Sequence, residues 1–283
     1  MNIPFKIDLT NKVVVVTGAG GVLCSMFSKA IAECGAKVAL LGRNIENVQA
    51  VADEITKEGH IAKAYKADVL DKEALETVRL RINEELGSCD MLINGAGGNN
   101  PSATTTNEYY FDGDIDRKDI ITFFNLDPQS VGAVFNLNFL GTLIPTQIFA
   151  RDMLGKDDAS IINISSMNSY TPLTKIPAYS GAKAAINNFT EWLAVHFAKS
   201  GIRVNAIAPG FFVTKQNQDL LFNEDGTPKP RTGKILEGTP MGRYGQSEEL
   251  VGALLFFLSK PAASFVTGVV IPVDGGFHAY SGV

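Results

Sequence analysis

Residues 166–183 read SMNSYTPLTKIPAYSGAK and follow an apolar run at residues 161–164 that is typical of a buried strand. Tyr179 comes thirteen positions after Ser166, and Lys183 comes four positions after Tyr179. If a helix begins at Tyr179, the tyrosine and the lysine share one helical face. An ammonium beside a phenol favours the phenolate, so this spacing predicts a lowered pKa for Tyr179 and proton exchange with a carbonyl or alcohol oxygen. We expect the Ser166 hydroxyl to hydrogen-bond the same oxygen, whereas the alternative interpretation is a capped, solvated helix start.

The strand-end Ile-Ser-Ser and the segment Tyr-Ser-Gly-Ala-Lys resemble the short-chain dehydrogenase/reductase family. The resemblance implies that Ser166, Tyr179 and Lys183 are catalytic. It also implies that Asn138, in the segment Asn-Phe-Leu-Gly, supports a water molecule in a proton relay. Asparagine is a poor residue inside a helix, which favours a specific role for Asn138, although Asn136 lies close by.

Composition limits the possible partners. The chain has 283 residues, 45% of them apolar, and a net charge of −5. We expect no nucleic-acid partner because the chain has no basic cluster. The three cysteines are far apart in sequence, and the N-terminus lacks a signal-peptide core, so we expect a cytoplasmic protein. No membrane span is expected, and the three histidines lack metal-ligand spacing, so no metal site is expected either.

A glycine turn follows the first predicted strand. Residues 12–17 form a β-branched run, a helical stretch ends before Gly35, and residues 37–41 form a second strand. This strand–turn–helix–strand order is the context of a dinucleotide-binding turn, in which glycines let the backbone approach a pyrophosphate at a helix N-terminus. The family pattern T-G-x-x-x-G-x-G is matched at Thr17 and Gly18, but Val22 and Cys24 replace its later glycines. We interpret Cys24 as a small packing residue rather than a reactive thiol.

The end of the second strand bears on the choice of cofactor. No carboxylate is present there to hold a ribose 2′-hydroxyl, whereas Arg43 offers a fork for a 2′-phosphate. The sequence therefore favours NADP, with NAD as the alternative and an exposed helix-start arginine as the other interpretation of Arg43. Asn44 is expected to cap the helix at residues 44–59.

Further cofactor contacts are implied by the resemblance. Asn94-Gly95-Ala96-Gly97 resembles the family motif N-N-A-G, with Gly95 in place of the second asparagine, and Asn94 is expected to stabilise the sheet. Asp68 is expected near the adenine or, alternatively, as the cap of the helix at residues 71–86. Residues 209–214 resemble P-G-x-x-x-T, which contacts the nicotinamide carboxamide. The predicted cofactor-binding residues are Gly18, Gly20, Gly21, Val22, Leu23, Arg43, Asn44, Asp68, Val69, Asn94, Ala96, Gly97, Tyr179, Lys183, Pro209, Gly210, Phe212 and Thr214.

The alternation of strands and helices predicts one α/β domain over residues 1–283. We expect a doubly wound parallel sheet of about seven strands, the Rossmann fold, with helices on both faces. Long helices are predicted at residues 128–153 and 179–199, and a further helix capped by Ser247 at residues 247–259. Two irregular insertions, residues 99–127 and 215–243, are expected near the substrate site. For the first, a contribution to subunit contacts is the alternative.

The predicted activity is reversible hydride transfer between a nicotinamide cofactor and a ketone/secondary alcohol pair. Two alternatives are a cofactor-binding sensor without catalysis and an interaction protein built on the same fold. The resemblance implies a homotetramer, with a dimer as the alternative.

Residues 92–101 and the insertion after them resemble the branch of D-mannonate oxidoreductases (fructuronate reductases). A sugar acid needs hydroxyl partners and a cation for its carboxylate. A ketogluconate, a sugar alcohol, a 3-oxoacyl thioester or a steroid is the alternative, and the last two would use an apolar cleft at Phe211 and Phe212. The candidate substrate contacts are Asn99, Asn100, Asn168, Lys175, Lys215 and Arg231.

Overall fold

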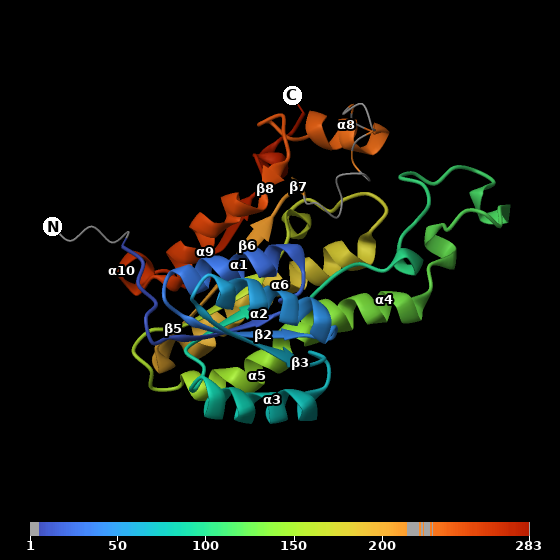
Figure 1. Ribbon diagram of the computed structural model, residues 1–283. Helices are drawn as coiled ribbons and strands as arrows, with labels where there is room; N and C mark the ends of the chain where they lie inside the picture. The colour runs from blue at the N-terminus through green and yellow to red at the C-terminus, as the bar shows by residue number, and fades with distance from the viewer. Residues whose placement is uncertain (1–5, 214–220, 222, 224–226, 228, 283) are drawn as a thin grey trace.

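A seven-stranded parallel sheet forms the centre of the molecule, in the strand order β3-β2-β1-β4-β5-β6-β9. The computed structural model describes residues 6–213, 221, 223, 227 and 229–282 (Figure 1). The strand order reverses between β1 and β4, so the carboxyl ends of these strands flank the crevice where ligands bind in such sheets. The strands are β1 (Val13–Thr17), β2 (Lys37–Gly42), β3 (Ile61–Lys66), β4 (Met91–Asn94), β5 (Ala159–Ile164), β6 (Ile202–Pro209) and β9 (Val270–Val273). The predicted fold class is confirmed.

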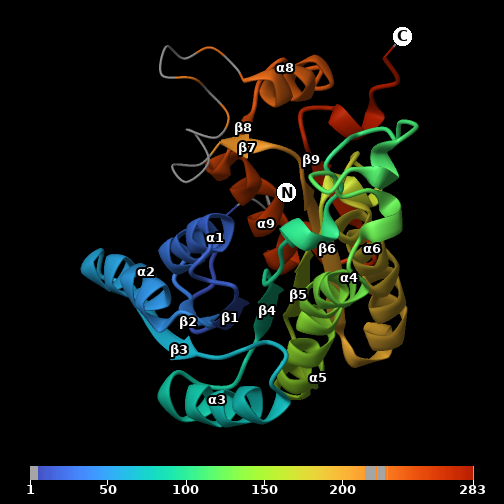
Figure 2. The same ribbon diagram turned by 90° about the vertical axis from the view of Figure 1, so that its right-hand side faces the viewer.

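Helices cover both faces of the sheet because its strands are apolar on both sides (Figure 2). One core contains side chains of α1 (Val22–Glu33), α2 (Ile45–Lys57) and α9 (Val251–Leu258). The other core contains side chains of α3 (Lys72–Glu85), α5 (Gly141–Met153) and α6 (Pro177–Phe197).

A buried polar chain connects the two central strands to the helices above them. The Asn94 amide donates to Thr146 Oγ1 and to Asn163 Oδ1, each at 2.9 Å. The Asn163 amide in turn donates to Thr190 Oγ1 at 2.9 Å. The expected sheet-stabilising role of Asn94 is therefore present, and it fixes α5 and α6 relative to the end of β4.

The long helix predicted at residues 128–153 is present and contains one wider turn. It consists of α4 (Pro128–Phe135), the π-helical turn η4 (Asn136–Leu140) and α5. By length and composition this segment is long and apolar enough to cross a membrane, but half of its most apolar window is buried inside the chain, as in the core helix of a soluble protein. The predicted bounds are therefore confirmed, but the apolar pattern did not reveal the wider turn that surrounds the buried Asn138.

Two further predictions need correction in the C-terminal third. The second insertion is not wholly irregular, because it contains α8 (Pro230–Glu237). Beyond it, β8 (Gly245–Gln246) pairs with β7 (Phe212–Val213).

The helix predicted from residue 247 is capped by Gln246 rather than Ser247, and it begins as the 3-10 turn η7 (Ser247–Leu250) before α9. Gln246 forms a capping box with Glu249, so the cap lies one residue earlier than predicted. The short helix α10 (Lys260–Ala263) follows α9.

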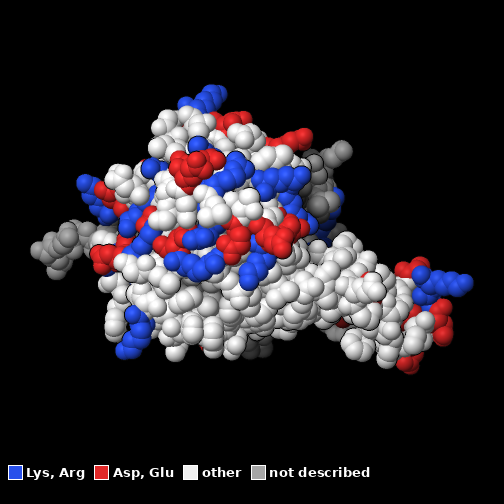
Figure 3. All heavy atoms as spheres, turned by 90° about the horizontal axis from the view of Figure 1, so that it is seen from below, with Lys and Arg blue, Asp and Glu red and all other residues white. Residues whose placement is uncertain are grey.

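The first insertion projects from the body as an arm, seen on the right of Figure 1. Its described turns are η1 (Pro101–Ala103), η2 (Asp114–Asp116) and η3 (Phe123–Asn125). Large apolar side chains are exposed along the arm: Tyr109, Tyr110, Phe111, Ile115, Phe123 and Phe124. Figure 3 shows a face with few charges that extends toward this arm, and the exposed Trp192 and Val195 lie on α6. The homotetramer stays a prediction.

Candidate active site

Ser166, Tyr179 and Lys183 come together at the carboxyl end of β5. Ser166 follows this strand in an extended conformation and is buried, and its hydroxyl hydrogen-bonds the Tyr179 side chain. Tyr179 lies in the first turn of α6, which begins at Pro177, and Lys183 follows one turn later. The Lys183 Nζ atom lies 5.6 Å from the centroid of the Tyr179 ring. The arrangement expected from the spacing is therefore present.

Lys183 does not lower the pKa of Tyr179, contrary to the prediction. The pKa of Tyr179 is raised above its ordinary value because burial disfavours the phenolate, and only the hydrogen bond with Ser166 acts in the opposite direction. The Lys183 ammonium instead donates to the Ile164 carbonyl oxygen at 2.8 Å and lies over the tyrosine ring. Tyr179 is thus a neutral phenol at neutral pH, the state that donates a proton to a carbonyl oxygen.

Lys183 is itself perturbed. Only 5% of the residue is exposed, and burial lowers the pKa of its ammonium to about 8. Near neutral pH the group is still largely protonated, because the pKa stays above this value. A deeply buried cation with one carbonyl partner remains able to bind a further oxygen, as the hydroxyls of a cofactor ribose would provide.

Asn138 uses its whole side chain to hold the backbone next to the site. Its amide donates to the Gly98 and Val134 carbonyl oxygens at 2.8 Å each, and its Oδ1 atom accepts from the Gly98 N–H at 3.2 Å. The side chain therefore fixes the segment after β4 to the π-helical turn. The water relay implied for Asn138 stays a prediction.

The glycine turn after β1 fits a pyrophosphate. Gly18 has a left-handed φ of 67°, and a Cβ there would lie 2.9 Å from the Ala96 backbone, so only glycine fits. Helix α1 begins at Val22, and its first turn has neither a side-chain cap nor an acidic residue. Its first backbone N–H groups are thus left for an anion, which the helix dipole also favours. Gly20, Gly21 and Leu23 complete this turn.

The other implied cofactor residues line the same edge of the sheet. Arg43 is exposed, and Asn44 caps α2 as predicted, accepting from the Glu46 N–H at 2.9 Å. Asp68 does not cap the next helix, because Asp71 does so by accepting from the Ala74 N–H at 3.0 Å.

The remaining members of the predicted set lie around the ends of the strands. Val69 packs against Gly141, where a Cβ would lie 2.9 Å from its Cγ2 atom. Pro209 ends β6, and Gly210 touches the Asp274 backbone so closely that a Cβ would lie 2.6 Å from it. Thr214 and Lys215 lie outside the described residues.

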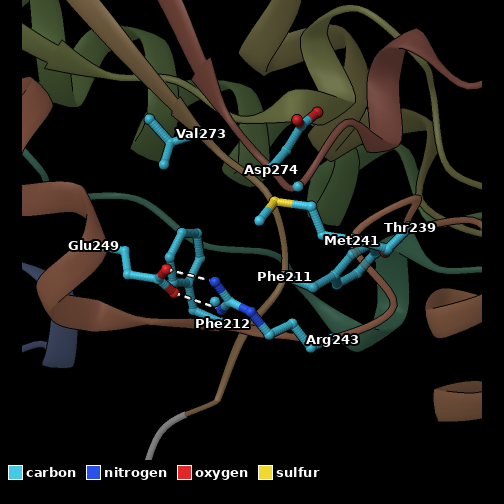
Figure 4. A pocket seen from close by; sticks show the side chains of 10 residues that line it. Phe211, Phe212, Thr239, Met241, Arg243, Glu249, Val273 and Asp274 are labelled. Atoms are coloured by element: carbon cyan, nitrogen blue, oxygen red, sulfur yellow. Dashed lines mark hydrogen bonds and ion pairs between the residues drawn. The ribbon is translucent and has the colours of Figure 1, made fainter.

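Two cavities meet at Phe211, which lines both. Figure 4 shows the first, where Arg243 is forked onto Glu249 with two contacts of 2.7 Å, beside Phe212 and Met241. The second cavity, of about 420 Å³, lies against the loop that leads to Tyr179. It is lined by Glu108, Thr171, Pro172, Leu173, Thr174, Lys175, Phe211, Arg231, Lys234, Ile235 and Phe277.

The second cavity contains some of the predicted substrate contacts and lacks others. Lys175 and Arg231 line it. Asn99 and Asn100 are engaged within the arm, the former donating to Thr104 Oγ1 at 3.0 Å and the latter accepting from the Ser102 N–H at 2.9 Å. Asn168 is buried beside Ser166 and does not line this cavity.

Lys234 and Glu108 also line this cavity and form an ion pair of 2.9 Å, although neither was predicted as a site residue. Lys234 lies on α8, and the apolar Ile235 of that helix also faces the cavity. The short amphipathic run after Pro230 was the available signal for it. Glu108 lies on the arm and offered no comparable signal, because only the folded structure brings it close to Lys234, which is distant in sequence.

Three features define a dinucleotide-dependent oxidoreductase of the doubly wound α/β class: the parallel sheet whose strand order reverses between β1 and β4, the glycine turn, and the Ser-Tyr-Lys group. The chain matches the short chain dehydrogenase family model over residues 12–225 and belongs to this family of NAD(P)-dependent oxidoreductases. A nicotinamide dinucleotide is therefore its cofactor, and the glycine turn and the buried Lys183 fit one.

Similar proteins cover nearly the whole chain. A solved structure from Haemophilus influenza, provisionally named a D-mannonate oxidoreductase and holding NAD, is 59% identical with a TM-score of 0.95, covering 100% of both chains. Gluconate 5-dehydrogenase of Gluconobacter oxydans is 34% identical, with 98% of each chain covered. A structure of gluconate 5-dehydrogenase from Burkholderia cenocepacia with NADP and tartrate is 26% identical with a TM-score of 0.82, covering 97% of this chain and 98% of that one.

Replacing Tyr179 by phenylalanine removes the proton donor while keeping the ring that packs against Lys183. We expect the kcat to fall by about 100- to 10,000-fold, the usual contribution of a general acid. Cofactor affinity should stay near normal, because the lysine is retained. Steady-state kinetics and cofactor titration check both parts, and a variant with nearly normal turnover would refute the assignment.

The lowered pKa of Lys183 predicts a pH-dependent stability. Between about 8 and the ordinary lysine value of 10.5, the unfolded chain binds more protons than the folded one, so stability increases with pH. Relative to Lys183→Met, the unmodified protein should gain about 2 kcal/mol between pH of about 7 and about 9.5. Urea unfolding of the cofactor-free proteins measures this difference, and a constant difference across that range would contradict it.

Proposed function

We propose that the protein interconverts a ketone and a secondary alcohol on a sugar acid, such as the D-fructuronate/D-mannonate pair, using NAD(P). The observation that carries this proposal is the second cavity, where Lys175 and Arg231 lie beside the loop that leads to Tyr179. A carboxylate is the natural partner of an arginine fork or a lysine ammonium. The names of the similar proteins, a D-mannonate oxidoreductase and two gluconate dehydrogenases, support the same substrate class.

The catalytic roles follow from the geometry and the protonation states. When bound, the nicotinamide supplies or accepts the hydride. Tyr179, a neutral phenol, donates its proton to the substrate carbonyl oxygen in reduction and takes it back in oxidation. Ser166 orients that oxygen and hydrogen-bonds the phenol. Lys183 holds the ribose hydroxyls, and its proximity to the ring fixes the tyrosine in place.

An apolar substrate such as a 3-oxoacyl thioester is the main competing hypothesis, because Phe211, Ile235 and Phe277 also line the cavity. The two hypotheses differ in what the cations contribute. A substrate carboxylate would use them directly, whereas an apolar chain would gain nothing from a lysine or an arginine in its path.

Removing one of these cations should therefore weaken the binding of substrates that carry a carboxylate, and leave the binding of neutral substrates unchanged. We expect Arg231→Gln and Lys175→Gln each to raise the KM for D-fructuronate by roughly 10- to 100-fold, the value of a charge-assisted hydrogen bond. The KM for a neutral ketose should change little. Lys234→Gln is the matched control, since its ammonium already pairs with Glu108.

The kinetic assay compares D-fructuronate, 5-ketogluconate, an acetoacetyl thioester and neutral ketoses with both cofactors. Equal losses for acids and neutral ketoses would show that the cations act on structure alone. A clear preference of the unmodified enzyme for the thioester or a neutral ketose over both acids would discard the sugar-acid proposal.

For the cofactor, we propose that NADP is preferred, with NAD as the alternative. Arg43 is exposed at the end of β2, where a 2′-phosphate would lie, and the preceding Gly42 adds no side chain. The similar structures differ in this respect, since one holds NAD and another NADP.

Arg43→Ala tests that preference. NADP affinity should fall by roughly 10- to 150-fold and NAD affinity by much less, because only NADP carries the phosphate. Titration of both reduced cofactors by fluorescence gives the ratio. Equal losses for both cofactors, or no loss for either, would leave NAD as the physiological cofactor.

A further inference from the structure

Two departures from the family pattern meet in space. Cys24 stands where the pattern has glycine, and Gly95 stands where it has asparagine. The first lies in α1 and the second directly after β4. A Cβ built on Gly95 would lie 2.1 Å from Cys24 Sγ, far closer than two such atoms can approach. The thiol therefore fills the space that a side chain at position 95 would need.

This contact cannot be relieved by a small movement of Gly95. On its other side the same Cβ would lie 3.0 Å from the Thr17 carbonyl oxygen, and the Gly95 N–H donates to Thr17 Oγ1 at 3.1 Å. Cys24 is 4% exposed and lies in the first turn of α1, so its sulfur has little free space into which to turn. Residue 95 is thus enclosed between the end of β1 and the first turn of α1.

The segment that begins at Gly95 continues into the catalytic group. A Cβ on Gly97 would lie 2.6 Å from Asn138 Oδ1 and 3.2 Å from Lys183 Nζ. Residues 95–97 are therefore held on one side by Cys24 and on the other by Asn138 and Lys183. A shift at the Cys24 contact displaces the backbone between the pyrophosphate turn and the lysine, which are the two ends of the cofactor site.

The thiol acts in this position as a packing group. Burial raises the pKa of Cys24 to about 12, so it is neutral at physiological pH and is a poor nucleophile. The thiol therefore affects the neighbouring backbone through its size and not through its reactivity.

We propose that Cys24 is a positioning residue for the nicotinamide cofactor: by packing on Gly95 it sets the position of residues 95–97. The sulfur at position 24 and a Cβ at position 95 exclude each other. The inference concerns cofactor binding and is independent of which sugar acid is the substrate. It accounts for both departures with one contact.

A double-mutant cycle on the full-length protein tests the coupling. The variants are Cys24→Ala, Gly95→Ala and the double variant. Cys24→Ala removes the sulfur and keeps a Cβ, which lies 3.7 Å from the Cβ added at position 95, an ordinary contact. The close approach to Thr17 is common to both backgrounds and cancels in the cycle. Fluorescence titration gives the Kd for NADH and NADPH, and thermal unfolding of the cofactor-free proteins gives their stability.

We expect Gly95→Ala alone to raise the cofactor Kd by roughly 10- to 100-fold, the range that overpacking of a rigid contact produces. The double variant should bind at least about fivefold more tightly than Gly95→Ala, because the clash is gone. Cys34→Ala, at the C-terminal end of the same helix, is the matched control and should leave the Kd unchanged.

Additive effects on Kd would overturn the proposal, since they would mean that residues 24 and 95 act independently. A lower thermal midpoint with unchanged Kd would also overturn it, because the role would then be structural alone. If Gly95→Ala does not fold, a folded, cofactor-binding double variant supports the proposal, and a double variant that is equally unfolded contradicts it.

Discussion

The backbone has no room for a side chain at Gly95 or at Gly97. A Cβ at Gly95 would collide with Cys24 of α1 and crowd the end of β1, and a Cβ at Gly97 would collide with Asn138 and crowd Lys183. Protein interiors are packed densely and deform little, so this segment holds the glycine turn after β1 and the Ser166-Tyr179-Lys183 group in a fixed relation. Buried hydrogen bonds from Asn94 to Asn163, and from Asn163 to Thr190, hold the residue before this segment to the neighbouring strand and to α6.

Electrostatics at the site are dominated by burial rather than by pairing. Both Tyr179 and Lys183 are shifted toward their neutral forms, because neither has a counter-charge near enough to offset the loss of water. The ribose hydroxyls of a bound nicotinamide dinucleotide would accept hydrogen bonds from Lys183 and so favour its charged form. The cofactor thus completes the electrostatic environment that the protein begins.

Much of the fold could be read from the sequence, because β-branched runs, glycine turns and helix caps are local signals. The alternation of strands and helices along the chain, the Asn44 cap and the Ser-Tyr-Lys spacing follow from such signals. What could not be read depends on tertiary surroundings. The π-helical turn at Asn138 is such a case, since its apolar pattern matches an ordinary helix.

The pKa of Tyr179 was mispredicted for a related reason. Spacing places the lysine on the correct face, but it says nothing of where the ammonium points, and here it points to the Ile164 carbonyl. Likewise, Cys24 and Gly95 each look like a defect in a motif when considered alone. Only their contact in space shows that each compensates for the other.

Phe211 has a consequence for the shape of the two cavities. Phe211 lines both cavities, so a different side chain at this position would alter the lining of each. The residue follows Gly210, which lies so close to the Asp274 backbone that no Cβ fits there. The Phe211 ring can change rotamer about its own side-chain bonds. Substitution at this single aromatic position would therefore change the shape of both cavities while leaving Ser166, Tyr179 and Lys183 in place.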